Sequence, residues 1–322
     1  MLALVYDGTT RLESNSPEPR PRAGEALLRV RRAGVCSTDI EITRGYMNYR
    51  GILGHEFVAD VVSAAKLPAG TRVAVEINCV CGACDMCAGG LANHCRRRTV
   101  IGIDGRPGAF AELIAVPERN CHRLPDSIGE DEAVFVEPLA AAVQITRQVK
   151  IEPRSRVAVL GSGRLGLLVA QVLARTGCRL IVIGRNPLTL EFLDRKGITA
   201  MPLRDLHSRF DQDFVVDCTG SAEGLDIAMS LVRPRGTIVM KTTCAGSTPV
   251  NLAPLVVNEV TLLGSRCGPF ADAIAMLARR EVDVASMITR RVPLARGVEA
   301  LRDADDPRQI KVIIEVATIG SA

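Results

Sequence analysis

An apolar strand, a glycine-rich turn and a helix follow one another at residues 156–177, and this run most constrains the fold. The stretch RVAVL leads directly into GSGRLG and then into LLVAQVLARTG. Gly161 permits a tight turn, Gly163 lets backbone amides approach a pyrophosphate, and Gly166 allows close helix–strand packing. The amino end of the helix favours anionic phosphates. In this setting the pattern indicates a dinucleotide-binding loop, which Arg164 and Leu165 complete, rather than a plain turn.

Strands and helices alternate around this turn, across residues 139–268. We expect helices at 139–149 and 187–197, and strands at 180–186, 210–220 and 236–243. That spacing is typical of βαβ units around a parallel sheet. The predicted fold class is therefore α/β, with a doubly wound parallel sheet of the Rossmann type.

Residues 1–138 have a different texture. Short β-branched runs at 25–35, 56–65, 71–78 and 109–116 are separated by Gly and Pro, which predicts a β-rich domain. After residue 268 we expect helices at 270–280 and 298–303 and a closing strand at 310–316. A chain of 322 residues is longer than one ordinary core supports, so more than one domain is expected.

The end of the second strand of the α/β region bears on the choice of dinucleotide. A Rossmann unit that binds NAD usually has an acidic residue here, which holds the ribose 2′-hydroxyl. This chain has Gly184 followed by Arg185, so a carboxylate that would repel a 2′-phosphate is missing. Arg185 could pair with that phosphate, or it could be a plain surface arginine. We favour NADP over NAD.

Four cysteines stand in the stretch CGACDMCAGGLANHC, at Cys81, Cys84, Cys87 and Cys95. Four thiolates match a tetrahedral Zn²⁺ with no open coordination position. The chain is large and shows no signal sequence, so metal binding in a reducing cytoplasm explains its cysteines better than disulfides do. Plain buried residues are expected at Cys178, Cys218, Cys244 and Cys267.

A second set of possible ligands lies upstream and near the domain boundary. Cys36 and the pair His55 and Glu56 offer thiolate, imidazole and carboxylate, and Glu137 follows at the boundary. Three protein ligands plus water make an open, catalytic zinc site. Taken alone, Cys36 would be a small core residue and His55 a hydrogen-bonded turn residue.

Composition and charge argue against other classes of partner. The net charge is +4 and aromatic residues make up 3% of the chain, so nucleic acid is not expected. Arg96, Arg97 and Arg98 follow the cysteine stretch, but such a loop is more often a solvated or subunit-contact patch. No stretch approaches the roughly 18–20 apolar residues of a membrane span. We therefore expect a cytoplasmic protein with no membrane partner.

Taken in order, the motifs resemble those of the zinc-dependent medium-chain dehydrogenase/reductases, in particular the alcohol, polyol and sugar dehydrogenase branch. The resemblance covers essentially the whole chain, through GVCSTD, GHEF, the cysteine stretch, GAFAEL, VEPLA, GSGRLG, DCTG and IKVII. It implies a GroES-like catalytic domain at 1–138 with a structural-zinc lobe at 79–98. It also implies a Rossmann domain at 139–268 and a segment at 269–322 that returns to the catalytic domain.

The resemblance implies metal roles for particular residues. Cys36, His55 and Glu137 would hold a catalytic zinc, with Glu56 as a supporting or exchanging ligand. The four lobe cysteines would hold a structural zinc, while Cys79 and the nearby His94 break the family spacing.

The resemblance also implies roles around the substrate. Thr38 would accept the proton of the substrate alcohol, and Asp39 would orient the site. Where classical alcohol dehydrogenases often have a proton-relaying histidine, this chain has Glu41. In this respect it is similar to sugar dehydrogenases, in which polar residues here and near Glu112 contact hydroxyl-rich substrates.

Further cofactor contacts are implied at the ends of later strands. Thr219 and Gly220 follow one strand, and Ser265 follows another in a segment that resembles the carboxamide-contacting segment of the family. Lys311 matches a basic residue near the pyrophosphate. Each of these residues could also be purely structural.

We therefore predict an oxidoreductase that transfers hydride between an alcohol, polyol or sugar hydroxyl and NAD(P), giving a ketone or aldehyde. It would carry one catalytic and one structural zinc and work as a homodimer or homotetramer. Zinc would act as a Lewis acid, and the nicotinamide would carry the hydride.

Two alternatives stay open. One is a zinc-free quinone or enone reductase of the same superfold, whose members lack the cysteine and glutamate ligands. The other is a non-catalytic, nucleotide-sensing zinc protein, which a basic face around the lobe would mark.

Overall fold

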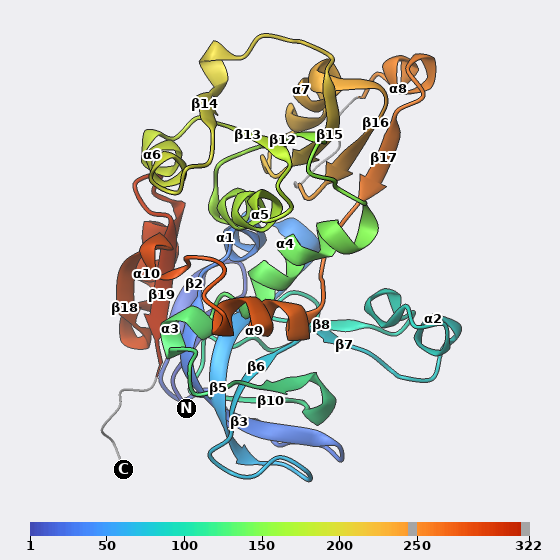
Figure 1. Cartoon of the computed structure of the whole chain (residues 1–322). Helices are drawn as coiled ribbons and strands as arrows, with labels where there is room; N and C mark the ends of the chain where they lie inside the picture. Colours follow the sequence, from blue (N-terminus) through green and yellow to red (C-terminus); the bar gives the residue numbers. More distant parts are fainter. Residues whose placement is uncertain (244–249, 317–322) are drawn as a thin grey trace. The chain divides into compact units, whose positions relative to one another are not determined.

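The computed structural model describes residues 1–243 and 250–316 (Figure 1). The chain forms two compact units: Met1–Glu137 together with the segment from Phe270 onward make unit 1, and Pro138–Pro269 make unit 2. Of the cysteines expected to be buried, Cys178, Cys218 and Cys267 are partly buried, and Cys244 lies outside the described residues.

Unit 2 is built on a six-stranded sheet in which neighbouring strands run parallel. The strands are β12 (Arg156–Leu160), β13 (Arg179–Gly184), β14 (Ala200–Pro202), β15 (Gln212–Asp217), β16 (Val232–Met240) and β17 (Thr261–Gly264). Their order across the sheet is β14–β13–β12–β15–β16–β17. This is the Rossmann order, and its direction of progression reverses between β12 and β15. The predicted fold class is confirmed for this unit.

The helices of unit 2 alternate with its strands, and capping contacts define where α6 begins. They are α5 (Arg164–Ala174), α6 (Pro187–Arg195), α7 (Gly224–Leu231) and α8 (Ala253–Val257), preceded by α4 (Val136–Gln148) and accompanied by the short turn η4 (Leu203–Asp205). At α6, the side chain of Asn186 accepts a hydrogen bond from Leu188 N at 3.0 Å, and Pro187 follows as the first helical residue. The side-chain cap and a proline whose ring holds φ near its helical value together define the amino end of the helix.

One apolar cluster of unit 2 lies between the sheet and α7, and α5 buries further apolar side chains such as Leu168 and Val169. Val215 from β15, Ile238 from β16 and Ala228 from α7 are each fully buried in one apolar cluster with β12 residues such as Ala158. The central strands therefore read as continuous apolar runs, as strands covered on both faces do.

Unit 1 is centred on a seven-stranded sheet of mostly antiparallel strands. Its strands are β3 (Glu25–Gly34), β5 (Glu56–Ser63), β6 (Arg72–Val75), β10 (Leu113–Pro117), β11 (Cys121–Arg123), β18 (Ile288–Pro293) and β19 (Lys311–Glu315). A second sheet holds β1 (Ala3–Tyr6), β2 (Thr10–Glu13) and β4 (Gly51–Ile52), and a third holds β7 (Asn78–Cys79), β8 (Thr99–Ile101) and β9 (Gly105–Arg106). Strand β19 pairs with β3 through Ile314 and Ala33, so the last described segment completes the first sheet.

Short helices complete unit 1. They are α1 (Ser37–Thr43), α2 (Asp85–Ala88), α3 (Glu130–Ala133), α9 (Phe270–Ala278) and α10 (Gly297–Asp305), with single turns η1 (Tyr46–Asn48), η2 (Ala92–His94), η3 (Glu118–Asn120), η5 (Ala285–Met287) and η6 (Leu294–Arg296). Across both described ranges, the helices are too short or too polar to cross a bilayer.

Candidate active site and metal centres

One cluster of possible metal ligands forms where β3 and β5 lie side by side. Cys36 follows β3 and caps α1, while His55 and Glu56 stand at the start of β5. Gly34 pairs with Glu56 in the sheet, and this register brings two segments far apart in the sequence together. The ligand atoms of Cys36, His55 and Glu56 all lie within 4.8 Å of one another. Thiolate, imidazole and carboxylate at this spacing suit Zn²⁺.

Asp39 orients this cluster from inside the protein. Its side chain is 0% exposed. Its Oδ2 accepts a hydrogen bond from Cys36 N at 2.8 Å, its Oδ1 accepts one from Gly54 N at 3.2 Å, and Oδ1 also lies 3.2 Å from His55 Nδ1. A carboxylate beside Nδ1 fixes the histidine ring and leaves Nε2 as the ligand atom.

The protonation of His55 follows from these neighbours. Burial disfavours its charged form, but the Asp39 carboxylate and the Cys36 thiolate outweigh this effect and raise the pKa of His55 well above its ordinary value. A buried carboxylate and a sulfur that face one imidazole make a site that attracts a cation, whether a proton or a metal ion.

Glu56 has a partner of its own within the cluster. Lys311 Nζ forms a buried ion pair with Glu56 Oε2 and also donates to Val35 O at 3.3 Å. The ammonium lies 5.6 Å from the centroid of the Phe135 ring. The pyrophosphate contact expected of Lys311 stays a prediction, and in unit 1 its hydrogen bonds go to Glu56 and Val35.

The other predicted residues of this centre lie in different settings. Thr38 is close, with Oγ1 3.8 Å from Cys36 Sγ. Glu41, on the same helix, accepts a hydrogen bond from Arg44 at 2.9 Å. Glu112 is exposed and accepts one from Leu2 N at 2.7 Å. Glu137 lies in the first turn of α4, and among the described residues it is outside the group of ligand atoms within 4.8 Å.

The second cluster consists of Cys81, Cys84, Cys87 and Cys95, whose sulfurs also lie within 4.8 Å of one another. Cys84 Sγ is 3.6 Å from Cys87 Sγ and 3.8 Å from Cys95 Sγ. Four sulfurs bound tetrahedrally to one Zn²⁺ at about 2.3 Å would lie about 3.8 Å apart. The cluster therefore has the dimensions of a closed tetrathiolate zinc site, in a lobe that extends from β7 and β8 (Figure 1).

Backbone amides favour the thiolate form at Cys81 and Cys84, where they lower the pKa, whereas burial raises the pKa of Cys87 to about 11. Ala83 N donates to Cys81 Sγ at 3.4 Å, and this bond chiefly lowers the pKa of Cys81 to about 5. Cys95 Sγ accepts from Cys81 N at 3.3 Å and from Arg97 N at 3.4 Å. Cys79, by contrast, is buried, and desolvation raises its pKa to about 11. It lies outside the described sulfur cluster, as does His94.

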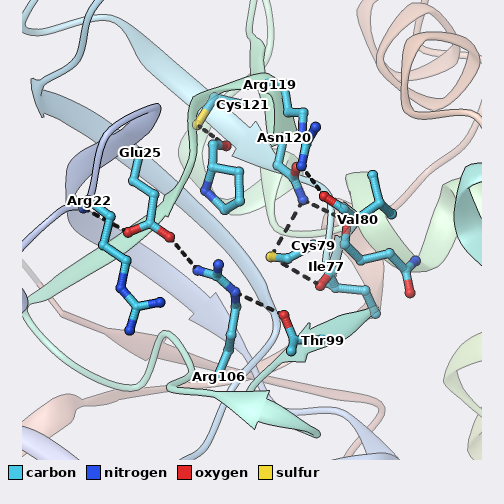
Figure 2. A network of polar contacts seen from close by, with 12 residues as sticks. Arg22, Glu25, Ile77, Cys79, Val80, Thr99, Arg106, Arg119, Asn120 and Cys121 are labelled. Carbon is cyan, nitrogen blue, oxygen red and sulfur yellow. Dashed lines mark hydrogen bonds and ion pairs between the residues drawn. The ribbon is translucent and has the colours of Figure 1, made fainter. Parts of the chain in front are cut away.

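A polar network at the base of the lobe ties it to the larger sheet of unit 1 (Figure 2). Asn120, which is 3% exposed, donates to Glu76 O at 2.7 Å and to Asn78 O at 2.9 Å. Figure 2 also shows Arg106 lying between Glu25 and Thr99, which it binds at 2.8 and 3.0 Å. The two strands that carry the lobe are thus fixed by buried and partly buried hydrogen bonds outside the sulfur cluster.

In unit 2, the glycine loop has the shape expected of a phosphate-binding turn. Gly161 has φ +94°, and a Cβ at this residue would collide with the backbone of Cys218. A Cβ at Gly166 would overlap Gly161 O, whereas the space beside Gly163 is open. Arg164 then begins α5, with Leu165 in its first turn. The loop closes tightly on itself and leaves one side accessible to a ligand.

The end of β13 excludes an acidic side chain. A Cβ at Gly184 would overlap Ser162 Oγ, which shares a hydrogen bond with Thr189 Oγ1 at 2.6 Å. Arg185 lies beside this position and pairs with Glu223 at 3.1 Å, but both side chains are more than two-thirds exposed. Such a surface pair is weak and easily exchanged for another anion.

The carboxyl ends of β15, β16 and β17 hold further predicted residues. Thr219 donates to Asp217 Oδ1 through both N and Oγ1, at 2.9 and 2.7 Å. Gly220 N donates to Thr242 Oγ1 at 3.0 Å. Ser265, at the end of β17, lies 3.3 Å from Lys241 Nζ. Sequence reasoning did not single out Lys241, although a lysine directly after an apolar strand is an unusual signal.

Comparisons with known proteins agree with both units. Residues 22–126 match the alcohol dehydrogenase GroES-like domain, and residues 165–281 match the zinc-binding dehydrogenase domain. The 2-dehydro-3-deoxy-L-galactonate 5-dehydrogenase of Pseudoalteromonas atlantica is 30% identical over 316 residues, which cover 92% of each chain. The chain belongs to the zinc-dependent medium-chain dehydrogenase family.

Two other similarities support this membership in the medium-chain dehydrogenases. The L-galactonate-5-dehydrogenase of Escherichia coli is 29% identical over 316 residues, covering 91% of this chain and 92% of the relative. A solved chain from Sinorhizobium meliloti, described as a zinc-binding dehydrogenase bound to NADP, superposes with a TM-score of 0.88 at 26% identity, covering 98% and 99% of the two chains. The predicted GroES-like and Rossmann domains and the predicted class, an NAD(P)-dependent oxidoreductase of the alcohol dehydrogenase kind, are confirmed.

Proposed function

We propose that this medium-chain dehydrogenase oxidises a secondary hydroxyl of a polyol or sugar acid to a ketone, reversibly, with NADP as the favoured hydride acceptor. Unit 1 would supply the catalytic centre and unit 2 the dinucleotide site. The observation that carries the proposal is the cluster of Cys36, His55 and Glu56, oriented by the buried Asp39.

The substrate class is suggested by the relatives and by the chemistry around the cluster. Two relatives that match nine-tenths of this chain are named as dehydrogenases that act at carbon 5 of sugar acids. Glu41, in place of a relaying histidine, adds a carboxylate on α1, the helix that Cys36 caps. Glu41 and Arg44 together offer both an acceptor and a donor to a hydroxyl-rich or carboxylate-bearing substrate.

We assign the catalytic metal to Cys36 and His55, with Glu56 and Glu137 as alternative carboxylate ligands. A zinc ion there supplies a Lewis acid that lowers the pKa of a substrate hydroxyl. Asp39 holds the imidazole of His55 in one orientation, and the ion pair with Lys311 holds the Glu56 carboxylate in place. Thr38 Oγ1, beside Cys36, takes up the proton of the hydroxyl and passes it outward.

The second metal belongs to the lobe. Four thiolates leave no open position for substrate, so the lobe zinc would stabilise the fold and take no part in the reaction. Thiolates of this kind must remain reduced to bind metal, which supports a cytoplasmic enzyme.

Residues of unit 2 would hold the dinucleotide across the switch point between β12 and β15. The loop from Gly161 to Gly166 receives the pyrophosphate, and Thr219, Gly220 and Ser265 line the edge beyond it. The steric exclusion of a carboxylate at Gly184 and the exposed guanidinium of Arg185 support NADP over NAD.

We also propose that the enzyme is a homodimer or homotetramer. Strand β17 is the last strand of its sheet, with Leu262 exposed, and the neighbouring α8 exposes Val256 and Val257 at 76% and 78%. An open strand edge next to an apolar helix face favours self-association. Sedimentation equilibrium or light scattering would give the mass directly, and a monomer at micromolar concentration would contradict this part.

A panel of alcohols, polyols, aldoses and aldonates tests the reaction, with NAD and NADP supplied in parallel and formation of the reduced nicotinamide followed by its absorbance. The expected result is turnover that is highest for a polyol or sugar acid and higher with NADP. Turnover of quinones or enones alone, or of no compound by a zinc-loaded protein, would overturn the proposal.

A further inference from the structure

The order of strands in unit 2 divides a bound dinucleotide into two halves. In a Rossmann unit the pyrophosphate sits over the glycine loop after the first strand, and the adenosine ribose lies at the end of the second strand. These strands are β12 and β13, on one side of the switch point. The nicotinamide half must therefore extend the other way, over the carboxyl ends of β15, β16 and β17.

Lys241 stands at that edge, directly after β16, and is 8% exposed. Its ammonium donates to Ala141 O at 2.7 Å, to Arg266 O at 3.0 Å and to Ser265 Oγ at 3.3 Å. An ammonium has three N–H donors and no acceptor, so it can bind these three oxygens at once. The acceptors come from α4 and from the segment that follows β17.

The same segment is held against α4 at a second point. A Cβ at Gly268 would overlap Ala140 O, so the backbone at Gly268 lies directly on the helix. The neighbouring loop is tied to β15 by Asp217, whose Oδ1 accepts from Thr219 and Thr242, while Lys241 N donates to Asp217 O at 2.9 Å. Lys241 thus joins the loops after β15, β16 and β17.

We propose that Lys241 is a positioning residue for the nicotinamide half of the cofactor. Its buried ammonium fixes the carbonyl of Arg266 and the hydroxyl of Ser265, so that the remaining backbone groups of 265–267 present a rigid edge to the nicotinamide. Preorganised hydrogen-bonding groups bind a ligand more tightly because less ordering accompanies binding. This inference rests on the proposed function, since it requires that unit 2 binds the dinucleotide.

The test separates the two halves of the cofactor. Dissociation constants for NADPH and for 2′,5′-ADP, which lacks the nicotinamide half, are measured by fluorescence or calorimetric titration of the whole zinc-loaded enzyme. If the wild type prefers NADH, NADH and 5′-ADP replace them. The variants are Lys241→Met and the milder Lys241→Gln, with Lys150→Met as the matched control, because Lys150 belongs to the same unit and is 87% exposed.

Loss of the charge-assisted hydrogen bonds of the Lys241 ammonium should weaken NADPH binding by about tenfold in Lys241→Met and less in Lys241→Gln. Binding of 2′,5′-ADP should stay within about twofold of the wild type, because the adenosine side of the sheet is untouched. Equal weakening of both ligands in Lys241→Gln, or no weakening of either, would overturn the inference. A wild-type enzyme that binds neither ligand would instead refute the proposed function.

Discussion

Replacing Asp39 by asparagine tests how the buried carboxylate supports the proposed catalytic metal centre. The substitution keeps the size of the side chain but leaves one oxygen where there were two. In the wild type the two oxygens accept from Cys36 N and Gly54 N at 2.8 and 3.2 Å, and one of them faces His55 Nδ1. The new amide N–H₂ must point at one of these donors, so a buried N–H loses its partner.

The size of the effect follows from these contacts. A buried donor without a partner costs about 1–3 kcal/mol, and a hydrogen bond to a charged group contributes about 1.5–3 kcal/mol. We therefore expect Asp39→Asn to lower the free energy of unfolding by about 2–4 kcal/mol. Because the carboxylate orients a ligating histidine, zinc affinity at this centre should fall about 10–100-fold.

The assay is zinc transfer to a coloured chelator at increasing chelator concentration, together with urea unfolding of the zinc-loaded protein. The lobe zinc should be retained by the variant. Asp305→Asn is the matched control, because Asp305 is 51% exposed and pairs only with the surface Arg44 among its described ion pairs. Its loss should change stability by about 0–1 kcal/mol. Zinc transfer from Asp39→Asn that is indistinguishable from that of Asp305→Asn would refute the reasoning.

Three further substitutions address the lobe, the glycine loop and the choice of cofactor. Asn120→Ala leaves Glu76 O and Asn78 O without the donor that Asn120 supplies, so the free energy of unfolding should fall by about 1–3 kcal/mol. Zinc should also leave the lobe faster in a chelator competition assay, and an unchanged rate would contradict the anchoring role. Gly166→Ala places a Cβ against Gly161 O, so it should abolish NADPH binding in a fluorescence titration while the zinc content stays normal. Retained binding would show that the loop does not hold the pyrophosphate. Arg185→Ala should raise the KM for NADP by about tenfold, the loss of one charge-assisted phosphate contact, with little change for NAD; equal KM changes would argue against a 2′-phosphate contact.

Much of the fold could be predicted because its signals are local. The apolar runs of β12 and β13 and the glycines between β12 and α5 specify a Rossmann unit within a short stretch of chain. The start of helix α6 is marked in the sequence by Asn186, which caps the helix, and by Pro187, its first residue. Helix α1 was missed, since seven residues with the polar start Ser37-Thr38-Asp39 carry too little periodicity to stand out.

The site was harder to predict because its geometry depends on strand register. Motifs pointed to Cys36, His55 and Glu56, but only the pairing of β3 with β5 shows how close their ligand atoms lie. The contacts that Asp39 makes with Cys36 N and Gly54 N likewise depend on this register. Lys311 lies more than 250 positions after Glu56 in the sequence, so no local pattern could reveal the ion pair between them. The hydrogen bonds of the Lys241 ammonium are equally non-local, since the acceptors come from α4 and from the segment that follows β17.

We propose a division between a catalytic metal centre at Cys36 and His55 and a structural metal centre in the lobe. Zinc content and turnover of Cys36→Ser and Cys84→Ser, measured side by side with NADPH binding, test this division most directly. Cys36→Ser should keep the lobe zinc and NADPH binding and lose turnover, whereas Cys84→Ser should lose lobe zinc and stability while the folded fraction still turns over. Full turnover by Cys36→Ser, with zinc bound only in the lobe, would contradict the account.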